Sequence, residues 1–301
     1  MTAQILFGFL PVFVVIAIGY FVRASGLIPR ASWRGVNTLN YRVLLPSLLF
    51  VTLARTEFAG PDALRLTALS LAGIATLAAC GFALIRLLSR ERPVIGAFIA
   101  VTSVWNIVLV LALATSVFGA QAQETAIRVL VPGSLLATLI ARYAVARGSG
   151  PVRLGGLASD PLVLGVILGL AASFTPLDRA GQLVRPLDIV ASGSISVILL
   201  AIGAGLDFGA LKGRYKVLAS AAGMRALASP VIFLAFALAA GFSGETLAII
   251  LIAASSPTAA FVFALVAEFE GEEGLTAGMI TASVLASAAT SPVFVWLALA
   301  L

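Results

Sequence analysis

Histidine is absent from this 301-residue sequence, and cysteine occurs once, at Cys80. These absences exclude a disulfide framework and leave no ligands for a metal site built from histidine and cysteine, so we predict no metal site and no cofactor. Charged residues are also scarce, at 11% of the chain against about 25% in soluble domains. Because every carboxylate lies in a predicted connection or near a predicted span end, the sequence does not favour an intramembrane enzyme.

Hydrophobic residues make up 61% of the chain, and the mean hydropathy is +1.12. Such a composition cannot cover a water-soluble surface, so most of the chain is predicted to lie in the lipid bilayer. The net charge of +6 comes from basic residues scattered through short connections, without a basic stripe or interleaved aromatic residues. We therefore predict a multi-pass protein of the cell (inner) membrane that does not bind nucleic acid.

Apolar runs of about 20 residues, long enough to cross roughly 30 Å of hydrocarbon, predict ten membrane-spanning helices. Five spans in each half is an odd number, so the second half must enter the membrane from the opposite face, as in an inverted repeat. We expect the first repeat at residues 1–145, a cytoplasmic linker at 146–160 and the second repeat at 161–301. The predicted spans are residues 5–22, 36–53, 66–88, 94–118, 125–144, 161–174, 187–206, 217–242, 246–267 and 275–301.

The distribution of basic residues predicts the orientation, because lysine and arginine in short connections favour the cytoplasm. Twelve of them follow odd-numbered spans and five follow even-numbered spans. We therefore expect the odd connections to be cytoplasmic and both termini to lie outside. The twelve are Arg23, Arg30, Arg34, Arg86, Arg90, Arg92, Arg142, Arg147, Arg153, Lys212, Arg214 and Lys216, and the five are Arg55, Arg65, Arg128, Arg179 and Arg185.

An interruption of the ninth span is the most informative feature of the chain. Ser255, Ser256, Pro257 and Thr258 stand there within an apolar run. Pro257 has no N–H group and its ring clashes with the preceding turn, so it frees carbonyl groups that hydrocarbon does not satisfy. This favours a transport site lined by the three hydroxyl side chains. The alternative is a simple kink that neighbouring helices satisfy.

Five segments, in order and at matching spacing, carry a resemblance to one family of transporters. They are LNYRVLLPSLLF at 39–50, DPLVLGVILGL at 160–170, LAIGAGL at 200–206, MRALASP at 224–230, and the Pro-Thr-Ala to Ala-Glu stretch at 253–268. They resemble patterns in the second, sixth, seventh, eighth and ninth spans of the auxin efflux carrier family. The sequence looks like a bacterial, PIN-like member of that family, whose architecture is shared with bile-acid sodium symporters.

This resemblance implies an all-α membrane fold in which ten helices form two inverted five-helix repeats. Helices four and nine would be broken and would cross, and the broken segments would line the substrate site with the Asn106 amide and neighbouring hydroxyls. Half-helix N-termini at the crossing would favour an anion. One departure leaves the break in helix four open, because the family has Gly and Pro after the asparagine and this chain has neither. Asn106 could also simply hydrogen-bond across helices.

Two arginines, Arg42 and Arg225, stand within apolar spans near their predicted cytoplasmic ends. A charge there is costly unless it is solvated or paired. Either side chain could snorkel to the headgroups or face a vestibule and recognise a carboxylate. Pro46 with Ser47 could line the site or form a packing kink. The candidate substrate-binding residues are Arg42, Pro46, Ser47, Ser103, Asn106, Arg225, Ser255, Ser256, Pro257 and Thr258.

From these features we predict a secondary transporter of a small organic anion or carboxylate that works by alternating access. The alternative is a sodium-coupled symporter of amphipathic, bile-acid-like anions. The coupling ion, H+ or Na+, stays open, since no carboxylate stands at membrane depth and backbone carbonyls could hold sodium. Gly165 and Gly169 form a small-residue face, which indicates close helix packing rather than a dimer contact, and a homodimer stays open.

Overall fold

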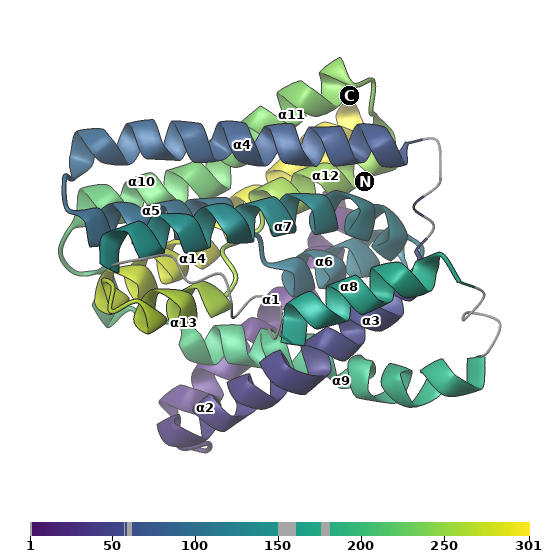
Figure 1. The fold of residues 1–301 in the computed structure, drawn as a ribbon, viewed down its shortest axis with the longest axis horizontal. Coiled ribbons are helices and arrows are strands. Elements are labelled where there is room, and N and C mark those ends of the chain that lie inside the picture. The colour runs from purple at the N-terminus through teal and green to yellow at the C-terminus, as the bar shows by residue number, and fades with distance from the viewer. Residues whose placement is uncertain (1, 57, 59–61, 150–160, 176–180) are drawn as a thin grey trace. The chain divides into compact units, whose positions relative to one another are not determined.

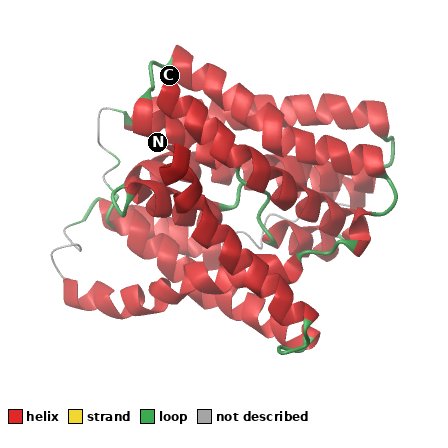
Figure 2. Cartoon of the chain, turned by 180° about the vertical axis from the view of Figure 1, so that it is seen from behind, coloured by secondary structure: helices red, strands yellow, loops and turns green. Residues whose placement is uncertain are grey.

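The computed structural model describes residues 2–56, 58, 62–149, 161–175 and 181–301, and all regular structure within them is helical (Figure 2). Eight of the described helical segments are long and apolar enough to cross a membrane. They coincide with predicted spans one to five, seven, eight and ten. Predicted spans six and nine appear as shorter apolar helices, Pro161–Ser173 and Gly244–Ser255. The protein is therefore a multi-pass membrane protein, and the count of ten spans remains a prediction.

The chain forms two compact units, each of which draws on both halves of the sequence. One unit comprises Met1–Phe9, Leu64–Val152 and Gly205–Leu301, and the other comprises Leu10–Ala63 and Arg153–Ala204. The repeat boundaries expected from the sequence remain a prediction, and residues 150–160 of the expected linker lie outside the described residues.

The larger unit contains the start of α1 (Thr2–Ala24) and most of the long helices (Figure 1). Its α4, α5 and α7 run alongside one another, with Gly96 of α5 against the backbone of α7. A Cβ atom on Gly96 would lie 2.7 Å from the Ala144 carbonyl oxygen, so only glycine allows this approach. The other helices are α4 (Ala63–Leu88), α5 (Arg92–Ser103), α6 (Ile107–Phe118), α7 (Ala122–Ser149), α10 (Tyr215–Gly223), α11 (Ser229–Ala239), α12 (Gly244–Ser255), α13 (Phe261–Glu268) and α14 (Glu273–Ala300).

The centre of this unit is formed by α5, α6 and α12. Helices α5 and α6 together form the segment Arg92–Phe118. In its most apolar stretch of 18 residues 89% of the residues are buried, against 33–44% in the corresponding stretches of the other seven long segments. Every residue of α12 from Leu247 to Ser255 is also buried. The two helical segments that sequence analysis connects with transport are therefore the core of the unit rather than its lipid-facing surface.

The smaller unit contains the rest of α1, α2 (Arg30–Leu39), α3 (Leu45–Ala54), α8 (Pro161–Ser173) and α9 (Gly181–Gly205). Helix α8 packs on α3 through the small-residue face of Gly165 and Gly169. A Cβ atom on Gly165 would lie 2.7 Å from the Pro46 carbonyl oxygen, and one on Gly169 would lie 2.9 Å from the Phe50 backbone. The prediction that these glycines allow close helix packing is confirmed.

Candidate functional site

The fourth predicted span is broken at its middle. Helix α5 ends at Ser103 and α6 begins at Ile107, with Val104 and Asn106 in non-helical backbone conformations. The Asn106 Oδ1 accepts a hydrogen bond from the Leu109 backbone N–H at 3.1 Å, so the side chain caps the new helix. This chain therefore interrupts the helix without Gly or Pro after the asparagine, and the question that the sequence left open is answered.

The ninth predicted span is broken at the serine–proline segment. Helix α12 ends at Ser255 and the eight-residue α13 begins at Phe261. Ser256 is extended, with φ −63° and ψ 147°, because the ring of a following proline disfavours the helical conformation. Pro257 therefore ends the helix rather than merely bending it.

The two interruptions contact each other directly. The Asn106 backbone N–H donates to the Pro257 carbonyl oxygen at 3.1 Å. The Thr258 hydroxyl donates to the Val101 carbonyl oxygen, near the end of α5, at 2.5 Å. Segments about 150 residues apart in the sequence thus satisfy each other's freed backbone groups, as a dry interior requires.

Arg225 joins the ends of both half-helices. It lies in a π-helical turn, Met224–Ala228, that precedes Pro230, and its side chain is fully buried. Its Nε donates to the Ser256 carbonyl oxygen at 3.1 Å and its Nη1 to the Thr102 carbonyl oxygen at 3.2 Å. Its Nη2 also donates to the Ser256 carbonyl oxygen and approaches the Ser256 hydroxyl. Arg225 does not snorkel to the headgroups.

Serines on neighbouring helices hold the same broken segment. The Ser229 hydroxyl donates to the Ala254 carbonyl oxygen at 2.7 Å. On α14, the Ser291 hydroxyl donates to the Ser255 carbonyl oxygen at 3.2 Å, and the Ser283 Oγ accepts the Thr258 N–H at 3.3 Å. Sequence analysis did not identify these three serines. A signal was available on α14, because Ser283, Ser287 and Ser291 follow one another at intervals of four residues and therefore share one face of the helix.

Several polar side chains at the interruptions have no partner. Among the described residues, the structure records no hydrogen bond for the buried Ser103 Oγ, Trp105 Nε1 and Ser287 Oγ. The Trp105 ring packs edge-to-face on Phe233, with centroids 5.2 Å apart. A buried polar group without a partner costs about 1–3 kcal/mol, so each of these atoms calls for an explanation.

The structure brings seven of the ten candidate residues together in the larger unit. These are Ser103, Asn106, Arg225, Ser255, Ser256, Pro257 and Thr258, and all of them are buried. The hydroxyls of Ser255 and Ser256 donate to carbonyls of their own helix, those of Leu251 and Ala253. Because both hydroxyl hydrogens are already used, these two serines can act toward a ligand only as hydrogen-bond acceptors.

The other three candidates, Arg42, Pro46 and Ser47, belong to the smaller unit. Arg42 is exposed and lies in a second π-helical turn, Asn40–Leu44, which also precedes a proline. The Ser47 hydroxyl donates to the Val43 carbonyl oxygen at 2.8 Å within its own helix. Pro46 is partly buried and packs against Gly165.

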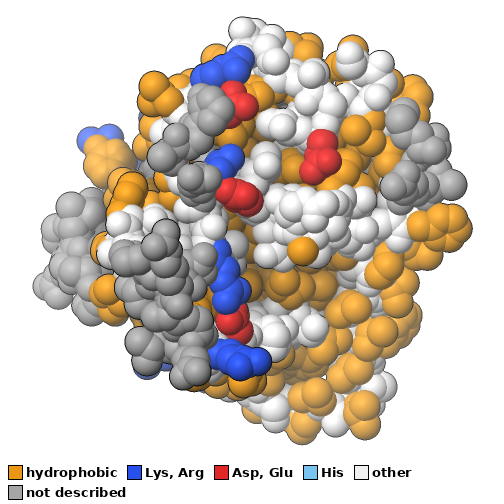
Figure 3. Space-filling view, turned by 90° about the vertical axis from the view of Figure 1, so that its right-hand side faces the viewer, with side chains coloured by type: hydrophobic (Ala, Val, Ile, Leu, Met, Phe, Trp, Pro, Cys, Tyr) orange, Lys and Arg blue, Asp and Glu red, His pale blue; other side chains and the backbone are white. Residues whose placement is uncertain are grey.

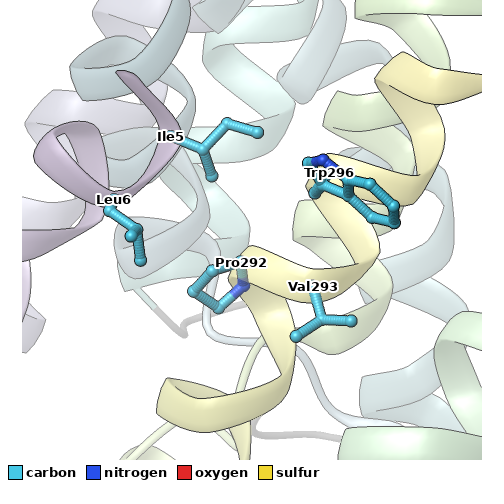
Figure 4. Close-up of a pocket in the computed structure, with 5 residues that line it drawn as sticks. All are labelled: Ile5, Leu6, Pro292, Val293 and Trp296. Carbon is cyan, nitrogen blue, oxygen red and sulfur yellow. The ribbon is translucent and has the colours of Figure 1, made fainter. Parts of the chain in front are cut away.

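Two hollows in the larger unit lie away from the interruptions. One, of about 400 Å³, is lined by hydrophobic side chains of α1 and α14, including Ile5, Leu6 and Trp296 (Figure 4). The other, of about 260 Å³, lies beside an ion pair in which Arg214 Nη2 contacts both carboxylate oxygens of Glu91 at 2.9 and 3.2 Å. The hydrogen bond to Glu91 raises the pKa of Arg214.

Among the described residues, two of the carboxylates bind partners away from the interruptions. Asp188 accepts two hydrogen bonds from Arg55, at 2.7 and 2.8 Å, and the Asp207 Oδ1 caps the Gly209 and Ala210 N–H groups. On the face drawn in Figure 3, basic and acidic side chains lie next to each other. The carboxylates nearest to predicted span ends, and so the nearest candidates for a proton carrier, are Glu57, Asp188, Asp207 and Glu268, of which Glu57 lies outside the described residues. No group of three potential metal-ligating side chains occurs in the part of the chain that the structure describes.

Comparison with known proteins gives one result. A family model described as "membrane transport protein" matches the chain over residues 5–149 and 149–295, which is nearly its whole length. No curated protein matches the chain.

Proposed function

Since the chain belongs to the membrane transport protein family, the family of the auxin efflux carriers, we propose that it is a secondary transporter of a small organic anion. The resemblance expected from the sequence is thereby confirmed, and the family is one of transporters rather than enzymes. The anion, the coupling and the mechanism are the proposal. The observation that carries it is the pair of broken helices that meet at Asn106 and Pro257.

The proposed substrate is a carboxylate bound where the two interruptions contact each other. Two half-helices, α6 and α13, begin at these interruptions, and the N–H groups at helix N-termini favour negative charge. Among the described residues, the Ser103 hydroxyl and the Trp105 indole N–H are buried beside Asn106 in the sequence and have no hydrogen-bond partner. Both groups can donate to a carboxylate oxygen, which would remove the cost of leaving them unpaired.

The proposed mechanism is alternating access. Asn106 is 3% exposed and Thr258 is 1% exposed, so a substrate cannot reach them without a conformational change. The unit with both interruptions would move relative to the unit with the second, sixth and seventh spans, in a protein of ten spans with both termini outside. Such rigid-body motion of one bundle against another is common in transporters built from inverted repeats.

A sodium-coupled symporter of amphipathic anions is the second candidate function. The observation that favours it is the unwound backbone after α12, where the Ser255 and Pro257 carbonyl oxygens each accept one hydrogen bond and keep a second lone pair. Such a carbonyl can coordinate sodium without a carboxylate. It predicts that sodium alone stabilises the purified protein.

The test is the thermal unfolding of the purified protein with mono- and dicarboxylates, each with and without sodium. A ligand that binds the native state at about 100 times its Kd adds about 2.7 kcal/mol of stability. We expect a carboxylate-specific rise in Tm that is lost in Asn106→Ala and Thr258→Ala, and uptake of the same carboxylate into vesicles that is lost in parallel. Each variant is compared with its own ligand-free Tm.

Thr52→Ala is the matched control, because the Thr52 hydroxyl donates to the Leu48 carbonyl within its own helix in the other unit. It should leave the ligand-induced rise in Tm unchanged. If both site variants kept the full rise and full uptake, the proposed site would be wrong. A rise with sodium alone would favour the symporter.

A further inference from the structure

Arg225 is a buried cation without an acidic partner. Its side chain is fully buried, and in the part of the chain that the structure describes no ion pair joins it to a carboxylate. Its partners are the Thr102 and Ser256 carbonyl oxygens and the Ser256 hydroxyl. A lone cation in an apolar interior is costly, so the charge must be balanced by the groups that surround it.

The groups that balance it are the C-terminal ends of two half-helices. Thr102 lies in the last turn of α5, and Ser256 directly follows α12. Each helix C-terminus carries roughly half a negative charge, so the two ends together carry roughly one. The positive charge of Arg225 cancels that sum.

This cancellation leaves the positive helix ends without an opposing charge. Helices α6 and α13 begin at the same two interruptions, and each N-terminus carries roughly half a positive charge. We propose that Arg225 sets the charge selectivity of the transport site: by neutralising the C-terminal ends of α5 and α12 it leaves a net positive field of about one charge, which selects a singly charged anion. The inference rests on the proposed function and names its substrate class.

Arg225 has this effect through the backbone and not by touching the substrate. Three of its nitrogens already donate to protein oxygens, and the planar fork reaches Thr102 on one side and Ser256 on the other. The ammonium group of a lysine keeps the charge but has no fork to span both carbonyls. The Arg225→Lys variant therefore distinguishes an effect of the positive charge from an effect of the planar hydrogen-bonding geometry.

The measurement is a ratio of affinities for two ligands of the same shape, a monocarboxylate that binds and its uncharged primary amide. A unit charge about 6 Å from the ligand changes the affinity for an anion roughly 100-fold at an effective dielectric constant of about 20. We expect Arg225→Met to lower the carboxylate-to-amide ratio roughly 100-fold while amide binding changes little. Arg225→Lys should keep most of the ratio.

Ser229→Ala is the matched control, because Ser229 caps the adjacent Ala254 carbonyl without carrying a charge. It should weaken the fold and leave the ratio unchanged. An unchanged ratio in Arg225→Met would overturn the inference. If that variant does not fold, Arg225→Lys decides, because loss of the ratio there would show direct, geometry-dependent recognition instead.

Failure of the proposed function gives a different result. In that case the wild-type protein binds none of the carboxylates, and the inference falls with it. When the wild-type protein binds a carboxylate and only the ratio is insensitive to Arg225, the function stands and the inference alone is wrong.

Discussion

Replacement of Asn106 by alanine tests whether the break in α5–α6 depends on one side chain. The Asn106 Oδ1 accepts the Leu109 N–H at 3.1 Å, and the residue is 3% exposed. Loss of an N-cap costs about 0.5–2 kcal/mol, and a buried N–H left without a partner costs about 1–3 kcal/mol. These are two descriptions of one lost bond, so we expect a total loss of about 1–3 kcal/mol.

Thermal unfolding of the ligand-free protein measures this loss. A change of this size lowers the Tm of a protein of this length by roughly 2–12 °C. Asn106→Ser is the comparison, because serine is as good an N-cap as asparagine and should retain most of the stability. In both variants the backbone N–H of residue 106 can still donate to Pro257. A Tm of Asn106→Ala equal to that of the wild-type protein would refute the capping argument.

Three further changes test other parts of the structure. Gly169→Ile forces a side chain into the backbone of α3, 2.9 Å away, and should lower the Tm by an amount that corresponds to about 1–3 kcal/mol, whereas Gly193→Ala, which meets nothing within 4 Å, should not. Asp188→Asn breaks the partly exposed pair with Arg55 and should change the free energy of unfolding by less than about 1 kcal/mol. Ser287→Ala removes a buried hydroxyl without a partner, so the ligand-free Tm should stay the same or rise; a fall would reveal a hydrogen bond at Ser287.

The interruption at Pro257 was predictable from sequence because proline imposes it by steric exclusion and by its missing N–H group. The break at Asn106 was not, since asparagine lowers helix propensity only modestly and no Gly or Pro follows it. What fixes the break is tertiary, namely the bond from its N–H to Pro257. Sequence pattern alone carries no record of such a partner.

The direction of a long side chain was the other unpredictable feature. Arg42 and Arg225 occupy similar positions, each a few residues before a proline and within a π-helical turn. One is exposed and the other is fully buried. The difference arises because Arg225 finds the freed carbonyls of α5 and α12, which only the folded core brings together.

The groups left unsatisfied at the interruptions favour an anion over a sodium ion. Six carbonyls near the breaks, those of Val101, Thr102, Ala254, Ser255, Ser256 and Pro257, already accept a hydrogen bond from the protein. Most of these oxygens keep one lone pair for a cation, whereas the buried Ser103 hydroxyl and Trp105 indole N–H have no partner at all, and the indole can only donate. Donors that lack a partner bind acceptors, and a carboxylate is the acceptor that a positive field also attracts. The spare hydrogen-bonding capacity and the balance of charge around Arg225 thus favour the same substrate class by independent physical arguments.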